Sequence, residues 1–134
     1  MATTPGPSPF ERIGGEAVLR PAVERFVDRA FDDLIIGFLF VHADRARVKQ
    51  HEYEHTARVL GADILYTGRP IPALHRPLRI NAGQFRRRLA LLRQELGRAG
   101  LPPDITALVI EAQERMQAQI TDGTDCGAPD VAGR

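Results

Sequence analysis

The apolar residues of this chain recur at intervals of three and four along several stretches, which is the spacing of one helix face. In residues 16–32 they fall at Leu19, Val23, Phe26 and Ala30. Two later stretches, 81–97 and 103–121, repeat the pattern, and their inward positions are Phe85, Leu89, Leu92, Leu96, Ile105, Leu108, Val109, Ala112, Met116 and Ile120. We therefore predict an all-α protein of about five amphipathic helices that pack on one another.

Capping residues indicate where the helices begin and end. A short first helix should begin at Ser8 and stop at Gly14-Gly15. Asp44 is placed to cap a helix that reaches Gly61. Gly97 and Gly100 should close the helix that begins after residue 81. Two pairs have the spacing of a capping box, Ser8 with Glu11 and Asn81 with Gln84.

The apolar run LIIGFLFV (34–41) is too short for its period to assign a structure. We interpret it as a tight helical turn followed by a corner, and a buried strand is the alternative. Residues 62–70 should form a connector, because the prolines from Pro70 onward leave room for only about a turn of helix around His75.

Length and composition bound the possible functions. The 134 residues predict one domain over 8–121, with a disordered arm at 1–7 and a flexible polar tail at 122–134. The net charge of +1 gives no bulk attraction to nucleic acid or to a membrane. A single cysteine, Cys126, and the lack of an 18-residue apolar run fit a cytoplasmic protein. The one dense basic run, residues 86–88, is interpreted as a solvated helix face.

Ionisable residues occupy the apolar stripe of the predicted helix 44–61. Its inward register should pass through Val48, then 51 or 52, then 55, then Val59. Positions 51, 52 and 55 are His, Glu and His. Because a buried unpaired carboxylate is costly, it must find a partner or become neutral. Two interpretations stay open: the helix is exposed and these groups pair locally, or they line a cavity.

The same residues match H-E-x-x-H, a pattern typical of zinc peptidases. A catalytic zinc needs a third protein ligand and an open position. The extended motif fails, because Arg58 stands where a glycine is expected. Glu95 or Glu111 could serve as a third ligand, but both are expected among surface charges. A zinc hydrolase therefore stays a remote alternative.

His75 lies in the proline-punctuated segment ALHRPLRI (73–80), beside Leu74 and Ile80. A lone histidine on an apolar segment is commonly a core residue with its hydrogen bonds satisfied. His75, however, stands opposite a helix that also carries histidines. This arrangement suits a haem, whose iron takes an axial histidine on one side and a reactive distal pocket on the other.

Several segments, in order and at matching intervals, make the chain resemble the truncated haemoglobins. These segments are FERIGG (10–15), VERF (23–26), LG (60–61), YTGRP (66–70), HRPLRI (75–80) and Phe85. The resemblance covers about residues 8–121 and implies a two-over-two helical sandwich that binds haem b, iron protoporphyrin IX. It also implies a small diatomic ligand (O2, NO or CO), a role in oxygen binding or transport, and a possible reductase partner.

The resemblance assigns roles to particular residues. His75 matches the proximal iron ligand, and Phe40 matches the phenylalanine that wedges against the porphyrin. Gly14-Gly15 matches the glycine pair at which the short first helix meets the second. On the distal side the matching positions are Val48, His51, Glu52 and His55. Further lining of the cofactor is expected from Phe26, Val27, Leu74, Ile80 and Phe85.

The chain departs from the family pattern on the distal side. Val27 stands where the family usually has a tyrosine that donates to iron-bound oxygen. Glu52 stands where glutamine or tryptophan is common, and an ionised carboxylate only accepts hydrogen bonds. The second glycine pair is Gly61-Ala62 here. These departures favour haem binding over a specific role in oxygen carriage or nitric oxide detoxification.

The identity of a sixth iron ligand stays open. His51 matches a position from which some cyanobacterial members bind the iron, and His55 competes with it. Glu52 is expected to orient one imidazole. An internal ligand would favour electron transfer, sensing, or chemistry with nitrite, nitric oxide or peroxide. The alternative is a globin-fold sensor or interaction module, with haem absent or regulatory, that docks through Arg86, Arg87, Arg88 and Arg93.

Overall fold

The computed structural model describes residues 6–67 and 80–120, with side chains up to residue 117. Every regular element within these ranges is a helix, as predicted. None of the helices described is long and apolar enough to cross a membrane. The elements are α1 (Pro9–Arg12), α2 (Glu16–Asp32), the 3₁₀-helix η1 (Gly37–Phe40), α3 (Arg45–Val59), α5 (Ala82–Arg98) and α6 (Pro103–Ile120).

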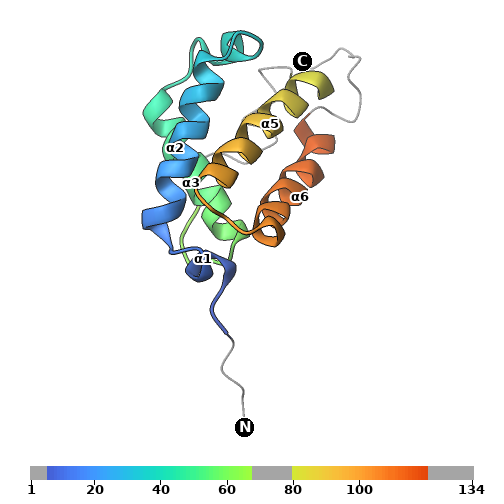
Figure 1. The fold of residues 1–134 in the computed structure, drawn as a ribbon. Helices are drawn as coiled ribbons and strands as arrows, with labels where there is room; N and C mark the ends of the chain where they lie inside the picture. The colour runs from blue at the N-terminus through green and yellow to red at the C-terminus, as the bar shows by residue number, and fades with distance from the viewer. Residues whose placement is uncertain (1–5, 68–79, 121–134) are drawn as a thin grey trace.

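The four long helices form two pairs, α2 with α3 and α5 with α6 (Figure 1). The pairs are joined by contacts of α2 with α5 and of α3 with α6. The short helix α1 lies at one end of the molecule, where the backbone amide of Phe10 donates to the carbonyl oxygen of Leu60 at 2.9 Å. The hydrophobic core therefore lies between two layers of two helices each.

The predicted apolar stripes of α2, α5 and α6 form this core, with one exception. Leu19, Val23, Phe26 and Ala30 of α2 are buried, and so are the four predicted positions of α5. On α6 the buried face is centred on Ile105, Val109 and Gln113. Leu108 was expected to point inward but is 42% exposed, because it lies beyond the edge of that face. The side chain of Ile120 lies outside the described residues.

The predicted capping residues act as expected. Both capping boxes form, and Asp44 accepts from the backbone amide of Arg47 at the start of α3. Gly14 has a φ of +107°, and a Cβ there would lie 2.7 Å from Cγ2 of Val18. A glycine is therefore required at the α1–α2 corner. The expected close at Gly100 is confirmed, because this glycine follows the C-cap Ala99 and has a φ of +85°, whereas Gly97 lies within α5, which continues to Arg98.

The run 34–41 contains η1, so the helical interpretation is confirmed and the strand alternative is wrong. The carboxylate of Asp33 organises this corner by accepting from the backbone amides of Ile35 and Ile36. The ring of Phe40 stacks on Phe31 with centroids 4.7 Å apart. The corner thus fixes the start of α3 relative to the end of α2.

Candidate functional site

Helix α3 has two inward faces, and the predicted register is the less buried one. Tyr53 and Ala57 are buried, and the guanidinium of Arg20 on α2 lies 4.1 Å above the Tyr53 ring. The predicted inward residues are only half-buried, so that register is corrected; they are Val48, His51, Glu52, His55 and Val59. We call these five residues the α3 stripe. It is neither core nor open surface, which is a common position for groups that line a site.

Glu52 is held by a charged partner on a distant helix. Nη2 of Arg88 donates to Oε2 of Glu52 at 2.7 Å, and Nη1 of Arg88 donates to Oε1 of Gln113 on α6. The Arg88 guanidinium also lies over the rings of Phe26 and Phe85, at 5.1 and 5.7 Å from their centroids. One of the two interpretations left open by the sequence was an exposed helix whose charges pair with one another. Glu52 does not fit that interpretation, because its partner lies on α5.

This network corrects the interpretation of the basic run at residues 86–88. Arg86 is exposed, but Arg87 binds Asp33 at 2.6 Å and Arg88 is only 4% exposed. A buried guanidinium is stable when its donors are satisfied and a carboxylate balances its charge. Glu52 balances the charge of Arg88, and Glu52 and Gln113 each accept a hydrogen bond from it, so the three side chains tie α3, α5 and α6 together.

His55 is the more buried histidine of the α3 stripe. Its Nε2 is buried and has no hydrogen-bond partner among the residues that the structure describes. Burial is the largest effect on the pKa of His55 and lowers it. The negative charge of Glu52 raises this pKa, whereas the positive charges of Arg88 and Arg58 lower it further. The imidazole of His55 is therefore neutral at pH 7.

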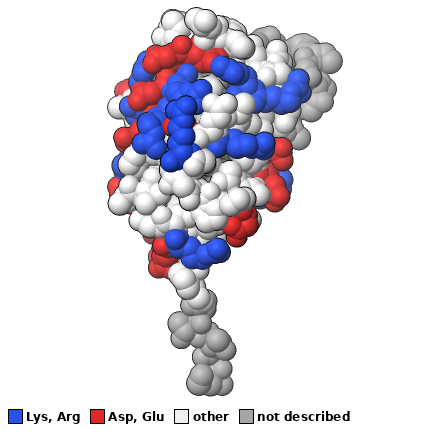
Figure 2. All heavy atoms as spheres, in the orientation of Figure 1, with Lys and Arg blue, Asp and Glu red and all other residues white. Residues whose placement is uncertain are grey.

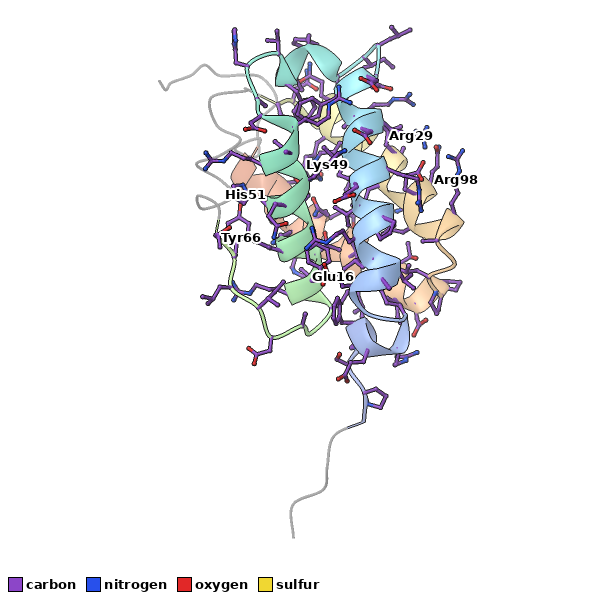
Figure 3. All side chains as sticks on the ribbon, turned by 90° about the vertical axis from the view of Figure 1, so that its left-hand side faces the viewer. Glu16, Arg29, Lys49, His51, Tyr66 and Arg98 are labelled. Atoms are coloured by element: carbon purple, nitrogen blue, oxygen red, sulfur yellow. The ribbon has the colours of Figure 1, made fainter. Side chains whose placement is uncertain are left out.

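Tyr66 lies beside both histidines of the α3 stripe (Figure 3 labels Tyr66 and His51). Its ring centroid is 5.8 Å from that of His51 and 6.4 Å from that of His55. The Tyr66 hydroxyl is buried and has no hydrogen-bond partner within residues 6–67 and 80–117. Burial raises its pKa, helped by the charges of Glu52 and Glu54. Two buried polar atoms on adjacent side chains thus lack partners in the described part of the chain, and buried polar atoms of folded proteins are usually hydrogen-bonded to protein, water or a bound group.

A buried carboxylate fixes the connector that carries Tyr66. Oε1 of Glu54 accepts from both the backbone amide and the hydroxyl of Thr67, and Oε2 accepts from Gln50 at 2.8 Å. Burial works to raise the pKa of Glu54, but these hydrogen bonds outweigh it and hold the pKa below its ordinary value. Glu54 therefore stays ionised and holds residues 66–67 against α3.

The other predicted site residues fall into three groups. Phe26, Val27 and Phe85 are almost fully buried, and Ile80 is buried just before α5. Phe40 and Val48 are partly buried and pack against the core. Leu74 and His75 lie outside the described residues, so the proximal assignment stays a prediction.

The zinc interpretation gains no third ligand from the described residues. No three histidine, cysteine or acidic side chains among them lie close enough to hold a metal ion. Glu111 is exposed, as expected, but Glu95 is completely buried, which corrects its placement among surface charges. Glu95 is bound by Arg25, Arg29 and Arg98, and Glu52, the general base of such a peptidase, is bound by Arg88.

Comparison with known proteins agrees with this arrangement. The family model for bacterial-like globins matches residues 8–122. The group 1 truncated haemoglobin GlbN of Mycolicibacterium paratuberculosis is 28% identical over 114 residues, which cover 85% of this chain and 84% of that protein. The fold is also similar to that of two solved truncated globins.

One is the 2/2 haemoglobin of Synechococcus sp. PCC 7002, solved in the cyanomet state with covalently attached haem. It is 25% identical with a TM-score of 0.76, and the match covers 87% of this chain and 99% of that one. The other is the ferric truncated haemoglobin of Tetrahymena pyriformis, 18% identical with a TM-score of 0.78, covering 85% and 97% of the two chains. The fold is thus a two-over-two helical globin, and the chain belongs to the bacterial-like globin family, among its truncated haemoglobins.

Sequence reasoning missed three residues of this site: Arg88, Gln113 and Tyr66. A signal existed for Arg88, which stands three residues after Phe85 and four before Leu92 on the predicted apolar face. Gln113 likewise stands four residues after Val109. Tyr66 was part of a matched segment, but no pattern in the sequence places it beside His51 and His55.

Proposed function

We propose that this chain binds haem b, with the α3 stripe on its distal side and His75 as the proximal ligand that the resemblance implies, and that the iron binds a small diatomic molecule. Membership of the globin family supports the cofactor, since a related 2/2 haemoglobin is described with attached haem. The observation that carries the proposal for the distal side is the buried Nε2 of His55, which no described residue hydrogen-bonds. Such an atom suits a pocket that a bound group completes.

The described residues fit the edge and distal face of a porphyrin. The α3 stripe combines apolar Val48 and Val59 with two imidazoles, and a flat apolar cofactor needs mostly apolar walls with few polar groups. A single cysteine excludes the paired thioether attachment of c-type haem, which supports haem b. His75 is the proposed proximal ligand, on the resemblance alone.

When bound, the haem iron supplies a binding position for a diatomic molecule and a one-electron couple. The chain's own residues set the distal environment. Val27 offers no hydroxyl, so a hydrogen bond to the ligand must come from another side chain. The Glu52 carboxylate faces Arg88, which compensates its charge and reduces its repulsion of a partly negative ligand.

His51 and His55 are the proposed sources of a reversible sixth ligand, and the two differ in environment. Both rings are half-buried, but His55 has a lowered pKa, a buried Nε2 and a ring edge-on to Tyr66. Only a deprotonated imidazole binds a metal, and the lowered pKa of His55 keeps it available at mildly acid pH. The histidine that does not bind the iron would act as a gate or a hydrogen-bond partner.

The test is the visible spectrum of the purified full chain, before and after addition of hemin, in ferric, ferrous and carbon-monoxide-bound forms. We expect stoichiometric haem uptake and a Soret band that shifts when carbon monoxide is added to the ferrous protein. His75→Ala should weaken haem binding, whereas exposed Arg47→Ala should not. A chain that takes up no hemin, or that binds it equally well without His75, would overturn the proposal.

A further inference from the structure

Arginines from two helices converge on one buried carboxylate at the α2–α5 seam. Arg25 and Arg29 of α2 and Arg98 of α5 bind Glu95, whose side chain is completely buried, at 3.2, 3.0 and 3.0 Å. The same seam continues to Arg87, which binds the buried Asp33. Figure 2 shows basic side chains gathered on the face formed by α2 and α5, with acidic side chains toward its edges.

One carboxylate does not balance three guanidiniums. Burial works to raise the pKa of Glu95, but hydrogen bonds from Arg29 and Arg25 and the charge of Arg98 hold it below its ordinary value. The ionised carboxylate thus lies beneath the surface, while the arginines that bind it are 33–66% exposed. The surface presents fixed positive charge, which attracts an anionic partner and speeds its association.

The outer ridge of α5 is uncharged between these arginines and two further ones, and Gln94 on it accepts a hydrogen bond from Arg29 at 2.8 Å. Ala90, Gln94 and Gly97 are exposed, and Arg86 and Arg93 are exposed beyond them. Gly97 has no structural need to be glycine: it lies inside the helix, and an added Cβ would meet nothing within 4 Å. An exposed helical glycine costs up to about 1 kcal/mol relative to alanine. Because Gly97 has no side chain, the surface of α5 is flat at this position, and another protein can approach it closely.

We propose that this face, defined by Arg25, Arg29, Arg86, Arg87, Arg93, Arg98 and Gly97, docks an acidic electron-carrier protein. The proposal rests on the haem function, because a ferric haem protein needs a one-electron donor. In that step the carrier loses one electron and the ferric iron gains it. The residues that define the face include no aromatic side chain, which favours a protein over single-stranded nucleic acid, where bases stack on aromatic rings.

The fixed arginines also suit a transient redox contact. Such contacts are small, fast and dependent on salt. Because Glu95 orients Arg25, Arg29 and Arg98 in the free protein, less side-chain entropy is lost when a partner binds. Arginine is also enriched among residues that dominate protein interfaces.

The experiment uses an acidic flavodoxin as the probe. Its binding to the purified full chain is measured by titration, with and without haem, and its reduction of the ferric protein is followed by stopped flow. Arg93→Glu should weaken binding and slow reduction about tenfold at low salt, and Gly97→Leu should do so about fivefold without lowering the melting temperature. The matched control Arg12→Glu, an equal charge change on α1, should alter either quantity less than about twofold.

Each outcome decides one claim. Equal binding by wild type, Arg93→Glu and Arg12→Glu would overturn the docking face, and so would tight binding of an oligonucleotide without binding of the flavodoxin. Binding that depends on Arg93 in a chain that takes up no haem would overturn the haem function and the electron-transfer role, but would leave the acidic-protein docking face. Haem uptake without flavodoxin binding would leave the haem function and remove the docking face.

Discussion

The guanidinium of Arg88 on α5 donates to the carboxylate of Glu52 on α3 at 2.7 Å, with both groups largely buried. This pair links the helix that carries the distal candidates to the opposite layer of the fold. It also changes what Glu52 can do, because a carboxylate bound by a guanidinium is not a bare negative charge beside a ligand. The pair is therefore both a structural link and part of the distal environment.

Removal of Arg88 should destabilise the fold strongly. Arg88→Leu leaves Glu52 in a largely buried position without its cation, and breaking one partner of such a pair costs about 3–5 kcal/mol. The measurement is the free energy of unfolding in urea at pH 7. The double variant Glu52→Leu/Arg88→Leu should recover part of the loss, because no unpaired charge remains. Exposed Arg86→Leu is the control and should change the free energy by less than about 0.5 kcal/mol.

A variant Arg88→Leu as stable as the wild type would contradict the buried pair. A double variant whose loss equals the sum of the two single losses would show that Glu52 and Arg88 contribute independently.

Glu95 should make stability depend on acid pH. Its pKa is lowered in the folded state, so its contribution is present above the ordinary pKa of a glutamate, near 4.5, and is lost as the pH falls through the lower folded value. Glu95→Gln should cost about 1–3 kcal/mol at pH 7, and the difference from wild type should shrink below about pH 4.5. Urea unfolding from pH 7 to pH 3 measures this difference.

The control for Glu95 is Glu111→Gln, an exposed glutamate on α6. It should show no comparable dependence on pH. A cost of Glu95→Gln that stayed constant down to pH 3 would mean that folding does not lower the pKa of this carboxylate.

Substitution of two glycines by alanine should change the stability of the protein in opposite directions. Gly14→Ala places a side chain at a φ of +107° and 2.7 Å from Val18, which should cost about 1–3 kcal/mol. Gly97→Ala adds a methyl group in open space within a helix and should stabilise by up to about 1 kcal/mol. Melting temperatures of the two variants check both signs. An unchanged melting temperature in Gly14→Ala would mean that the α1–α2 corner relaxes without cost.

The helices could be predicted because their signals are local. The period of Leu19, Val23, Phe26 and Ala30 and the two capping boxes depend only on neighbours in sequence. Charges on an apolar stripe are different. Whether such a charge is solvated or paired depends on which helix packs against it. Glu95 pairs with Arg25 and Arg88 pairs with Glu52, and both partners are far away in sequence. A run of three arginines therefore looked solvated although its third member is buried.

The candidate site could be predicted only in part, because some of its features depend on which helices pack together. The resemblance supplied the positions of the α3 stripe, but not the partner of Glu52 or the nearness of Tyr66 to His51 and His55. Both depend on contacts between elements. The sequence predicted that the α3 stripe is the buried face of its helix. In the structure Tyr53 and Ala57 pack against the core, and the α3 stripe lies half-buried on a different face.

The spectra of two single variants should identify the sixth ligand. If an imidazole of the α3 stripe binds the iron, the ferric protein is low-spin at neutral pH, and either His51→Ala or His55→Ala makes it high-spin. The resemblance favours His51, and the buried unpartnered Nε2 favours His55. The other variant should stay low-spin and change only the rate at which carbon monoxide enters. Exposed His42→Ala is the matched control and should leave the spectrum unchanged. A wild-type protein that is high-spin at pH 7, with a spectrum unchanged in both variants, would rule out ligation by either histidine.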